Sequence, residues 1–140
     1  MALRNGSRLG VSMQDVFSHG CHLVPDSIVE AQDYDEKTGR RTPAVDKLTG
    51  QRVFQCRVVD MDPELEGRPR ETVVKILADR MPVPPTRTPF EAVEFEGLHV
   101  TPYVDSGRCQ GRGRCTARMA FSLRAAGIKA AARPVSKDAA

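Results

Sequence analysis

Short runs in which apolar and polar residues alternate make up much of this chain, and turns that contain Gly or Pro separate them. Between residues 53 and 61, Phe54, Cys56 and Val58 fall on one side of an extended chain, and the polar residues between them fall on the other. Alternation of this kind is typical of a strand with one buried face. An Asp-Pro pair closes the run, so we predict a strand that ends there.

Further runs also have the character of strands. Residues 72–77 are rich in β-branched side chains, which favour strands. Residues 21–24 begin another strand that continues towards Tyr34, and residues 93–96 alternate cleanly. Residues 46–50, Asp-Lys-Leu-Thr-Gly, predict a turn, because Asp accepts local backbone hydrogen bonds and Gly tolerates positive φ. The prolines of residues 82–85 predict an extended connection.

The alternation changes phase near Gly97. Phe95 and Leu98 are both apolar, yet residues three apart fall on opposite faces of a regular strand. A local irregularity restores the pattern, so we predict a β-bulge or kink at Gly97. Pro102 indicates that this strand ends nearby or becomes an edge strand.

Residues 116–126 fit two structures. Read with a period of two, the odd-numbered residues from Ala117 to Ala125 form an apolar face. Read as a helix, the segment has Thr116 as a capping residue and Gly127 as a terminator. Propensity favours the helix and alternation favours the strand, and we predict the strand. Four residues of the alternating runs are expected in the core: Phe54, Val93, Phe95 and Phe121.

Five or six short strands separated by turns predict a mainly β protein, built as a single small antiparallel sheet or barrel. An OB-like barrel is one candidate. A chain of 140 residues with 40% hydrophobic residues supports one modest core rather than two. We assign residues 11–131 to a single β-rich domain and expect residues 1–10 and 132–140 to be disordered termini.

The net charge of +3 is unevenly distributed. Residues 1–104 hold 13 Lys and Arg against 16 Asp and Glu, whereas residues 105–140 hold 8 against 2. The first part therefore carries −3 and the last part +6. A basic C-terminal third on an acidic body indicates a polyanionic partner, or else a solvated basic tail that aids solubility.

The chain has neither an apolar run long enough to span a membrane nor a signal-peptide pattern after Arg4 and Arg8. We therefore expect a cytoplasmic protein without a membrane partner, in which the four Cys stay reduced. No pattern in the sequence indicates an oligomeric state.

Several Cys and His residues raise the question of a metal. His19, Cys21 and His22 are close in sequence, and Cys109 and Cys115 come later. Thiolate and imidazole are good zinc ligands, but these spacings match no common zinc module, and buried Cys is an ordinary small hydrophobe. We predict no metal site.

Other signatures of chemistry are incomplete. The alternating acids of residues 60–66 lack the central Gly of an EF-hand, because Leu65 stands at that position. The glycines of residues 107–113 lack the Gly-Lys-Ser/Thr of a P-loop. No nucleophile elbow occurs. We therefore expect a protein that is not an enzyme and that needs no cofactor.

Several motifs in this order resemble one known family, the replication, integration and excision activators of actinomycete integrating conjugative plasmids. The similar segments are residues 15–20, 46–50, 58–64, 93–98, 101–104 and 118–125. The most specific is Thr-Pro-Tyr-Val at residues 101–104. Phe54 stands where the family has Trp, and Phe121 stands where it has Tyr or Trp. The segment between Cys109 and Cys115 is similar to a variable insertion.

This resemblance implies a regulator that switches on replication, excision and integration of a mobile plasmid, with no catalytic residues. Two mechanisms stay open at this point. The protein either contacts DNA through its basic C-terminal third, or it is an adaptor that binds a replication initiator or recombinase without touching DNA.

For the first mechanism, we predict a DNA-contact surface made by four arginines: Arg112, Arg114, Arg118 and Arg124. In a strand, Arg118 and Arg124 share a face, about 20 Å apart at roughly 3.3 Å per residue, so they reach separate phosphates. Arg112 and Arg114 lie on the preceding Gly-rich turn and extend the same patch. The alternative is a solvated face whose arginines pair with the acidic body.

Overall fold

The structure is a computed structural model, and it describes residues 6–65, 70–85, 87–105 and 118–131. It is mainly β, as predicted. Its elements are β1 (Leu9–Gly10), α1 (Met13–Val16), β2 (Cys21–Leu23), β3 (Val29–Glu30), β4 (Gln32–Asp35), β5 (Arg40–Pro43), β6 (Arg52–Asp60), β7 (Glu71–Ala78), β8 (Ala92–Glu96), β9 (His99–Asp105), β10 (Arg118–Ala125) and β11 (Gly127–Ala130). No helix in the described part of the chain is long and apolar enough to cross a membrane.

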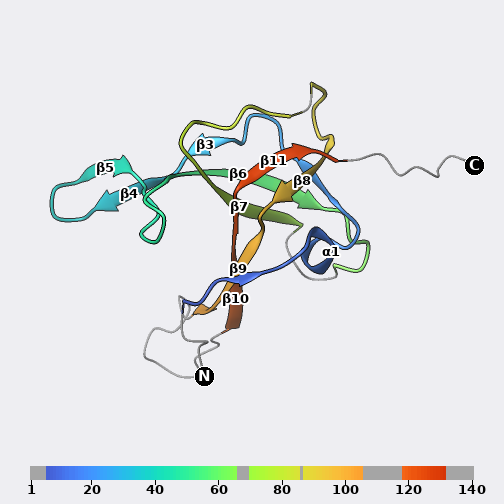
Figure 1. The fold of residues 1–140 in the computed structure, drawn as a ribbon, viewed down its shortest axis with the longest axis horizontal. Helices are drawn as coiled ribbons and strands as arrows, with labels where there is room; N and C mark the ends of the chain where they lie inside the picture. The colour runs from blue at the N-terminus through green and yellow to red at the C-terminus, as the bar shows by residue number, and fades with distance from the viewer. Residues whose placement is uncertain (1–5, 66–69, 86, 106–117, 132–140) are drawn as a thin grey trace, which may run out of the picture.

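Most strands belong to one curled sheet with the order β1-β9-β10-β7-β6-β2-β8-β11, and β3 adds to β6 (Figure 1). Its ladders are antiparallel except for one, because β10 runs parallel to β7. The predicted antiparallel sheet thus contains one parallel ladder. The prediction of a strand over residues 116–126 is confirmed in the described residues, since β10 begins at Arg118.

Two bent strands close the sheet into a half-barrel. β8 continues into β9, and β10 continues into β11. Because β8 pairs with β2 and β10 pairs with β7, the ladders form a circuit through β2, β6, β7, β10–β11 and β8–β9. In chain order the circuit has five strands: β2, β6, β7, the bent strand β8–β9 and the bent strand β10–β11. The third and the fifth of them run parallel, and this is the connectivity of an OB-type barrel.

Gly97 lies at the bend between β8 and β9, and Ala126 faces it at the bend between β10 and β11. The pairs Glu96↔Gly127 and His99↔Arg124 leave two residues between them on each strand, so the register contains no extra residue. The predicted irregularity is therefore a kink rather than a bulge, and Gly97 supplies it with a φ of +62°. Both strands change phase at the same point, which keeps Phe95 and Leu98 in one core.

The core lies inside this half-barrel. Its buried side chains come from β2, β6, β7, β8 and β10, and Phe54, Val93 and Phe95 are among them, as predicted. The same prediction for Phe121 is wrong, because its side chain is 60% exposed. Phe121 lies in the half of β10 that has no ladder to β7, since that ladder covers only residues 123–125 of β10.

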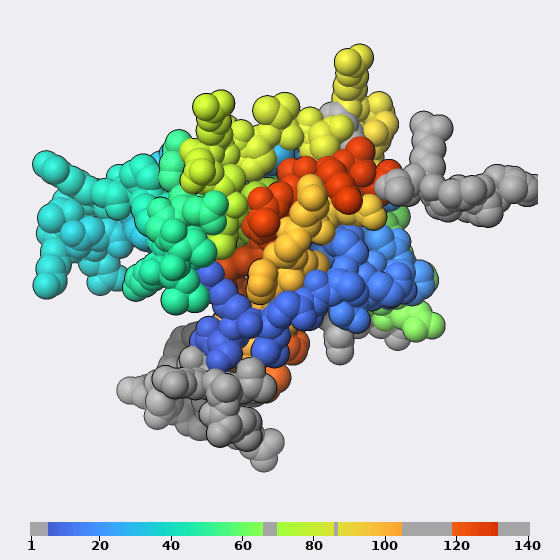
Figure 2. Space-filling view, viewed as in Figure 1, coloured from blue at the N-terminus to red at the C-terminus, as the bar shows by residue number. Residues whose placement is uncertain are grey.

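A second, smaller cluster covers the opposite face of β6. Val53 packs there with Ala31 and Ala44, and Leu77 is packed against them. The hairpin of β4 and β5 extends from this cluster and projects from the side of the molecule (Figures 1 and 2). All residues of both hairpin strands are exposed.

The fold begins earlier than predicted. Residues 9 and 10 form β1, which pairs with β9, so the assignment of residues 1–10 to a disordered terminus is wrong for these two. Figure 2 shows this N-terminal segment crossing the surface beside β8 and β9. The short helix α1 follows, with a capping box between Ser12 and Asp15 that the sequence contains as a Ser-x-x-Asp signal. Residues 132–140 lie outside the described part.

Candidate nucleic-acid interface

Two of the four predicted contact arginines lie on β10. Arg118 is the first residue of β10, where its backbone pairs with Asp105 of β9, and Arg124 lies near the end of the same strand. Arg112 and Arg114 lie outside the described residues, in the segment that joins β9 to β10 along the chain. Among the described residues, β10 therefore carries two of the four predicted arginines.

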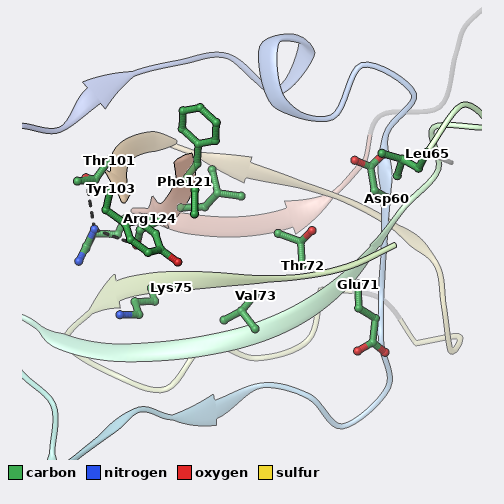
Figure 3. Close-up of a pocket in the computed structure, with 13 residues that line it drawn as sticks. Asp60, Leu65, Glu71, Thr72, Val73, Lys75, Thr101, Tyr103, Phe121 and Arg124 are labelled. Carbon is green, nitrogen blue, oxygen red and sulfur yellow. Dashed lines mark hydrogen bonds between the residues drawn. The ribbon is translucent and has the colours of Figure 1, made fainter. Parts of the chain in front are cut away.

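Arg124 is partly buried, although it was predicted on an outward face. Its guanidinium donates hydrogen bonds to the hydroxyls of Thr101, at 3.5 Å, and Ser122, at 3.3 Å (Figure 3). Burial lowers the pKa of this guanidinium and the charge of Arg8 acts in the same direction, whereas Asp46 opposes them. Arginine stays charged in proteins despite such shifts. Arg124 thus offers a positive charge on a positioned side chain.

A polar row crosses the outer face of the sheet through Arg124. Lys75 of β7 pairs with Arg124, and Gln55 of β6 pairs with Lys75 in the next ladder. On the other side, His99 of β9 pairs with Arg124. Because cross-strand partners present their side chains on the same face, these residues line up across four strands. Lys75 was absent from the predicted site, since it lies in a run chosen only for its β-branched residues.

A groove of about 920 Å³ lies beside this row, over β7, β9 and β10 (Figure 3). It opens where β7 and β10 are no longer paired with each other. Residues 71–73 of β7 pair only with β6 in the described ladders, and residues 118–122 of β10 pair only with β9. The groove therefore follows from the short parallel ladder between β7 and β10.

The two ends of the groove differ in charge. Lys75 and Arg124 lie at one end, and Asp60 and Glu71 lie at the other (Figure 3). Glu71 forms an ion pair with Arg57 of β6, at 3.2 Å, which partly offsets its charge. An anionic group is thus attracted to the end formed by Lys75 and Arg124.

Two aromatic side chains line the groove. Tyr103 of β9 and Phe121 of β10 are 47% and 60% exposed. The chain has seven aromatic residues, and two more of them, Tyr34 and Phe90, are exposed elsewhere. Exposed aromatic rings were not expected, because an aromatic residue in an alternating run is usually part of the core. The signal for Tyr103 was its place beside Pro102, which indicated an edge.

A largely buried ion pair lies next to Arg124. Arg8 pairs with Asp46, whose carboxylate also accepts hydrogen bonds from the backbone N–H and the hydroxyl of Thr49. The hydrogen bond from Arg8 and those from Thr49 hold the pKa of Asp46 well below its usual range, against the effect of burial. The pair joins the start of β1 to the predicted turn at residues 46–50. The ion pair therefore holds the segment before β1 against this turn at one side of the candidate interface.

The Cys and His residues do not gather into a site in the described part of the chain. No group of three His, Cys, Asp or Glu able to hold a metal occurs among the described residues. Cys21 and Cys56 are buried free thiols, and burial raises the pKa of each to about 12. Cys109 and Cys115 lie outside the described residues. The ring Nδ1 of His22 donates a hydrogen bond to the backbone oxygen of Phe90, at 2.7 Å.

Comparisons with known proteins found no matching family model, no matching curated protein and no matching solved structure.

Proposed function

We propose that this chain is a non-enzymatic DNA-binding regulator that activates replication, excision and integration of a mobile plasmid. The observation that carries the proposal is the groove over β7, β9 and β10, in which Lys75 and Arg124 lie beside the exposed ring of Tyr103. Cationic side chains bind phosphates, and aromatic side chains bind bases.

The topology supports the same surface. OB-type barrels bind oligonucleotides on the face of their second and third strands and through the loops between the first and second and the fourth and fifth strands. In this chain the third strand is β7, and the loop between the fourth and fifth is the segment that contains Arg112 and Arg114. The loop between the first and second is the β4–β5 hairpin.

The test is the salt dependence of DNA binding, measured by fluorescence anisotropy with a labelled 20-nucleotide strand, alone and annealed to its complement. Loss of two phosphate contacts in Arg118→Ala/Arg124→Ala should flatten the log–log salt slope by about 1.8 units on duplex or about 1.4 units on single strands. Thermal melting shows whether the double variant keeps its fold.

The matched control is Arg80→Ala/Arg87→Ala, which removes the same charge from two exposed residues of the connection between β7 and β8. It should leave the slope within about half a unit of the parent, the change expected of less than one phosphate contact. Equal slopes for parent and Arg118→Ala/Arg124→Ala, or an equal loss in the control, would show that this hairpin is not the contact surface.

The alternative function is a protein adaptor for a replication initiator or recombinase. It is favoured by Val104 and Met119, which are cross-strand partners and are both largely exposed. An exposed apolar pair suits a protein interface better than a phosphate backbone. This alternative predicts no DNA binding at low salt, together with loss of binding to the purified initiator or recombinase in Met119→Asp.

A further inference from the structure

The two exposed rings of the groove lie on different faces of β10. Tyr103 belongs to the face of its cross-strand partner Ala120, whereas Phe121 belongs to the opposite face. In Figure 3, Phe121 points away from β7 and Tyr103 lies next to Arg124. The two rings therefore flank the part of β10 that has no ladder to β7.

Phe121 also lines a second hollow, of about 550 Å³, at the open end of the half-barrel. Val16 and Phe17 line its α1 side, and Thr72 lines its β7 side. Four residues, Asp60, Thr72, Phe121 and Leu123, line both this hollow and the main groove. A ligand that passes from one face of β10 to the other, beside residues 118–122, can thus place one planar group on Tyr103 and another on Phe121.

The polar groups lie beside only one of these rings. Arg124, Thr101 and Ser122 form a hydrogen-bonded group next to Tyr103, with Lys75 across the ladder. Asp15 and Asp60 line the second hollow together with Phe121. A phosphate is therefore favoured beside Tyr103 and disfavoured beside Phe121, which leaves Phe121 to an uncharged base.

These positions suit unpaired bases. In a duplex the bases are stacked and paired inside the helix, so they cannot separate to reach rings on two faces of one strand. The one helix among the described residues, α1, has four residues and is too short to read a major groove. A duplex would have to be bound by the β9–β10 hairpin as a ribbon, without the stacking contacts.

We propose that the groove binds single-stranded DNA, with one base stacked on Tyr103, a second on Phe121 and a phosphate held by Lys75 and Arg124. This inference rests on the proposed function, because it names the form of DNA that the same surface takes. Base–aromatic stacking has little sequence preference, so binding should tolerate changes of sequence.

The experiment compares three labelled probes by fluorescence anisotropy: a mixed 20-nucleotide strand, its 20-base-pair duplex, and a 20-mer of abasic sites. The strand should bind the parent at least tenfold more tightly than the duplex does. Tyr103→Leu and Phe121→Leu should each weaken binding of the strand about tenfold, the effect of losing one stacked base. Phe90→Leu removes a similarly exposed ring from the connection before β8 and should leave the affinity unchanged.

The abasic probe separates stacking from charge. It keeps the phosphates, so the parent should bind it about as weakly as the Tyr103→Leu/Phe121→Leu variant binds the normal strand. The double variant should lose nothing further on the abasic probe, because the rings then have no bases to contact. Melting temperatures of both single variants should match the parent, since both rings are exposed.

Two results overturn the inference while the proposed function stands: duplex binding at least as tight as strand binding, or ring variants that bind the strand like the parent. In either case the Arg118→Ala/Arg124→Ala variant would still flatten the salt slope. If neither probe binds at low salt, the proposed function and this inference both fail, and the adaptor alternative gains support.

Discussion

One continuous ladder, formed by residues 92–105 and 118–130, has two halves that share their strands and register but differ in burial. In the β8–β11 half, Val93 and Phe95 are buried, and Ile128 packs against the core. In the β9–β10 half, four large residues are exposed: Tyr103, Val104, Met119 and Phe121. The kink at Gly97 separates the two halves.

The difference comes from what faces each half. Phe95 has a facing layer, because the ring of Phe17 lies 6.3 Å from its own and its N–H donates to the sulfur of Met13, at 3.4 Å. Among the residues that the structure describes, the β9–β10 half has only the two-residue strand β1 beside it and a short ladder to β7. The same alternation therefore builds a core on one side of the kink and a candidate binding surface on the other.

The largest expected effect tests this contrast directly. Phe95→Ala should reduce the free energy of unfolding by about 3–5 kcal/mol, because it removes a ring from a packed core. Phe121→Ala should change it by less than about 0.5 kcal/mol, because that ring is mostly in solvent. Urea unfolding followed by circular dichroism measures both. Equal losses for the two variants would mean that the two halves are packed alike.

The next effect concerns the ion pair at the start of β1. Asp46→Asn should cost about 1–3 kcal/mol at pH 7, because it leaves Arg8 without its partner. The pKa of Asp46 is lower in the folded than in the unfolded protein, where it is about 3.9. The pair therefore stabilises the fold above about pH 4, and this contribution is lost as the pH falls towards the folded-state pKa.

Urea unfolding at pH 7 and at pH 3 checks this prediction, since the gap between parent and Asp46→Asn should narrow at the lower pH. The matched control is Glu30→Gln, which breaks the more exposed pair with Arg52 and should cost less than about 1 kcal/mol. A gap that stays constant or widens at pH 3 would contradict the role given to Asp46.

The smallest expected effect is at the kink itself. Gly97→Ala should cost about 1–2 kcal/mol, because φ is +62° there and the new Cβ would lie 3.0 Å from the Cβ of Ala126. Gly50→Ala is the control, since its φ is +75° but no atom lies within 4 Å of its Cβ position. It isolates the cost of the backbone conformation.

Thermal melting of three variants separates the two causes at the kink. Gly97→Ala/Ala126→Gly removes the contact and keeps the positive φ, so its melting temperature should recover to that of Gly50→Ala. If Gly97→Ala melts like the parent, the kink tolerates a side chain and no longer explains why the two halves of the ladder diverge.

Local patterns predicted many of the elements. The alternation of Phe54, Cys56 and Val58 gave both the strand β6 and its buried face, because a period of two depends only on neighbouring residues. The turn at residues 46–50 was predicted for a similar reason, and Gly50 has the positive φ expected of it. Of the predicted contact arginines, Arg124 lines the groove, whereas Lys75, Tyr103 and the exposure of Phe121 were missed.

The sequence by itself determined the mainly β class, the core face of β6 and β8, the irregularity at Gly97 and the basic character of residues 105–140. Only the tertiary structure decided the parallel ladder between β7 and β10, the pairing of Arg8 with Asp46 and the exposure of Phe121. The physical reason is distance along the chain. Alternation and turn chemistry act between near neighbours, whereas burial requires a second layer, and residues far away in the sequence decide whether that layer is present.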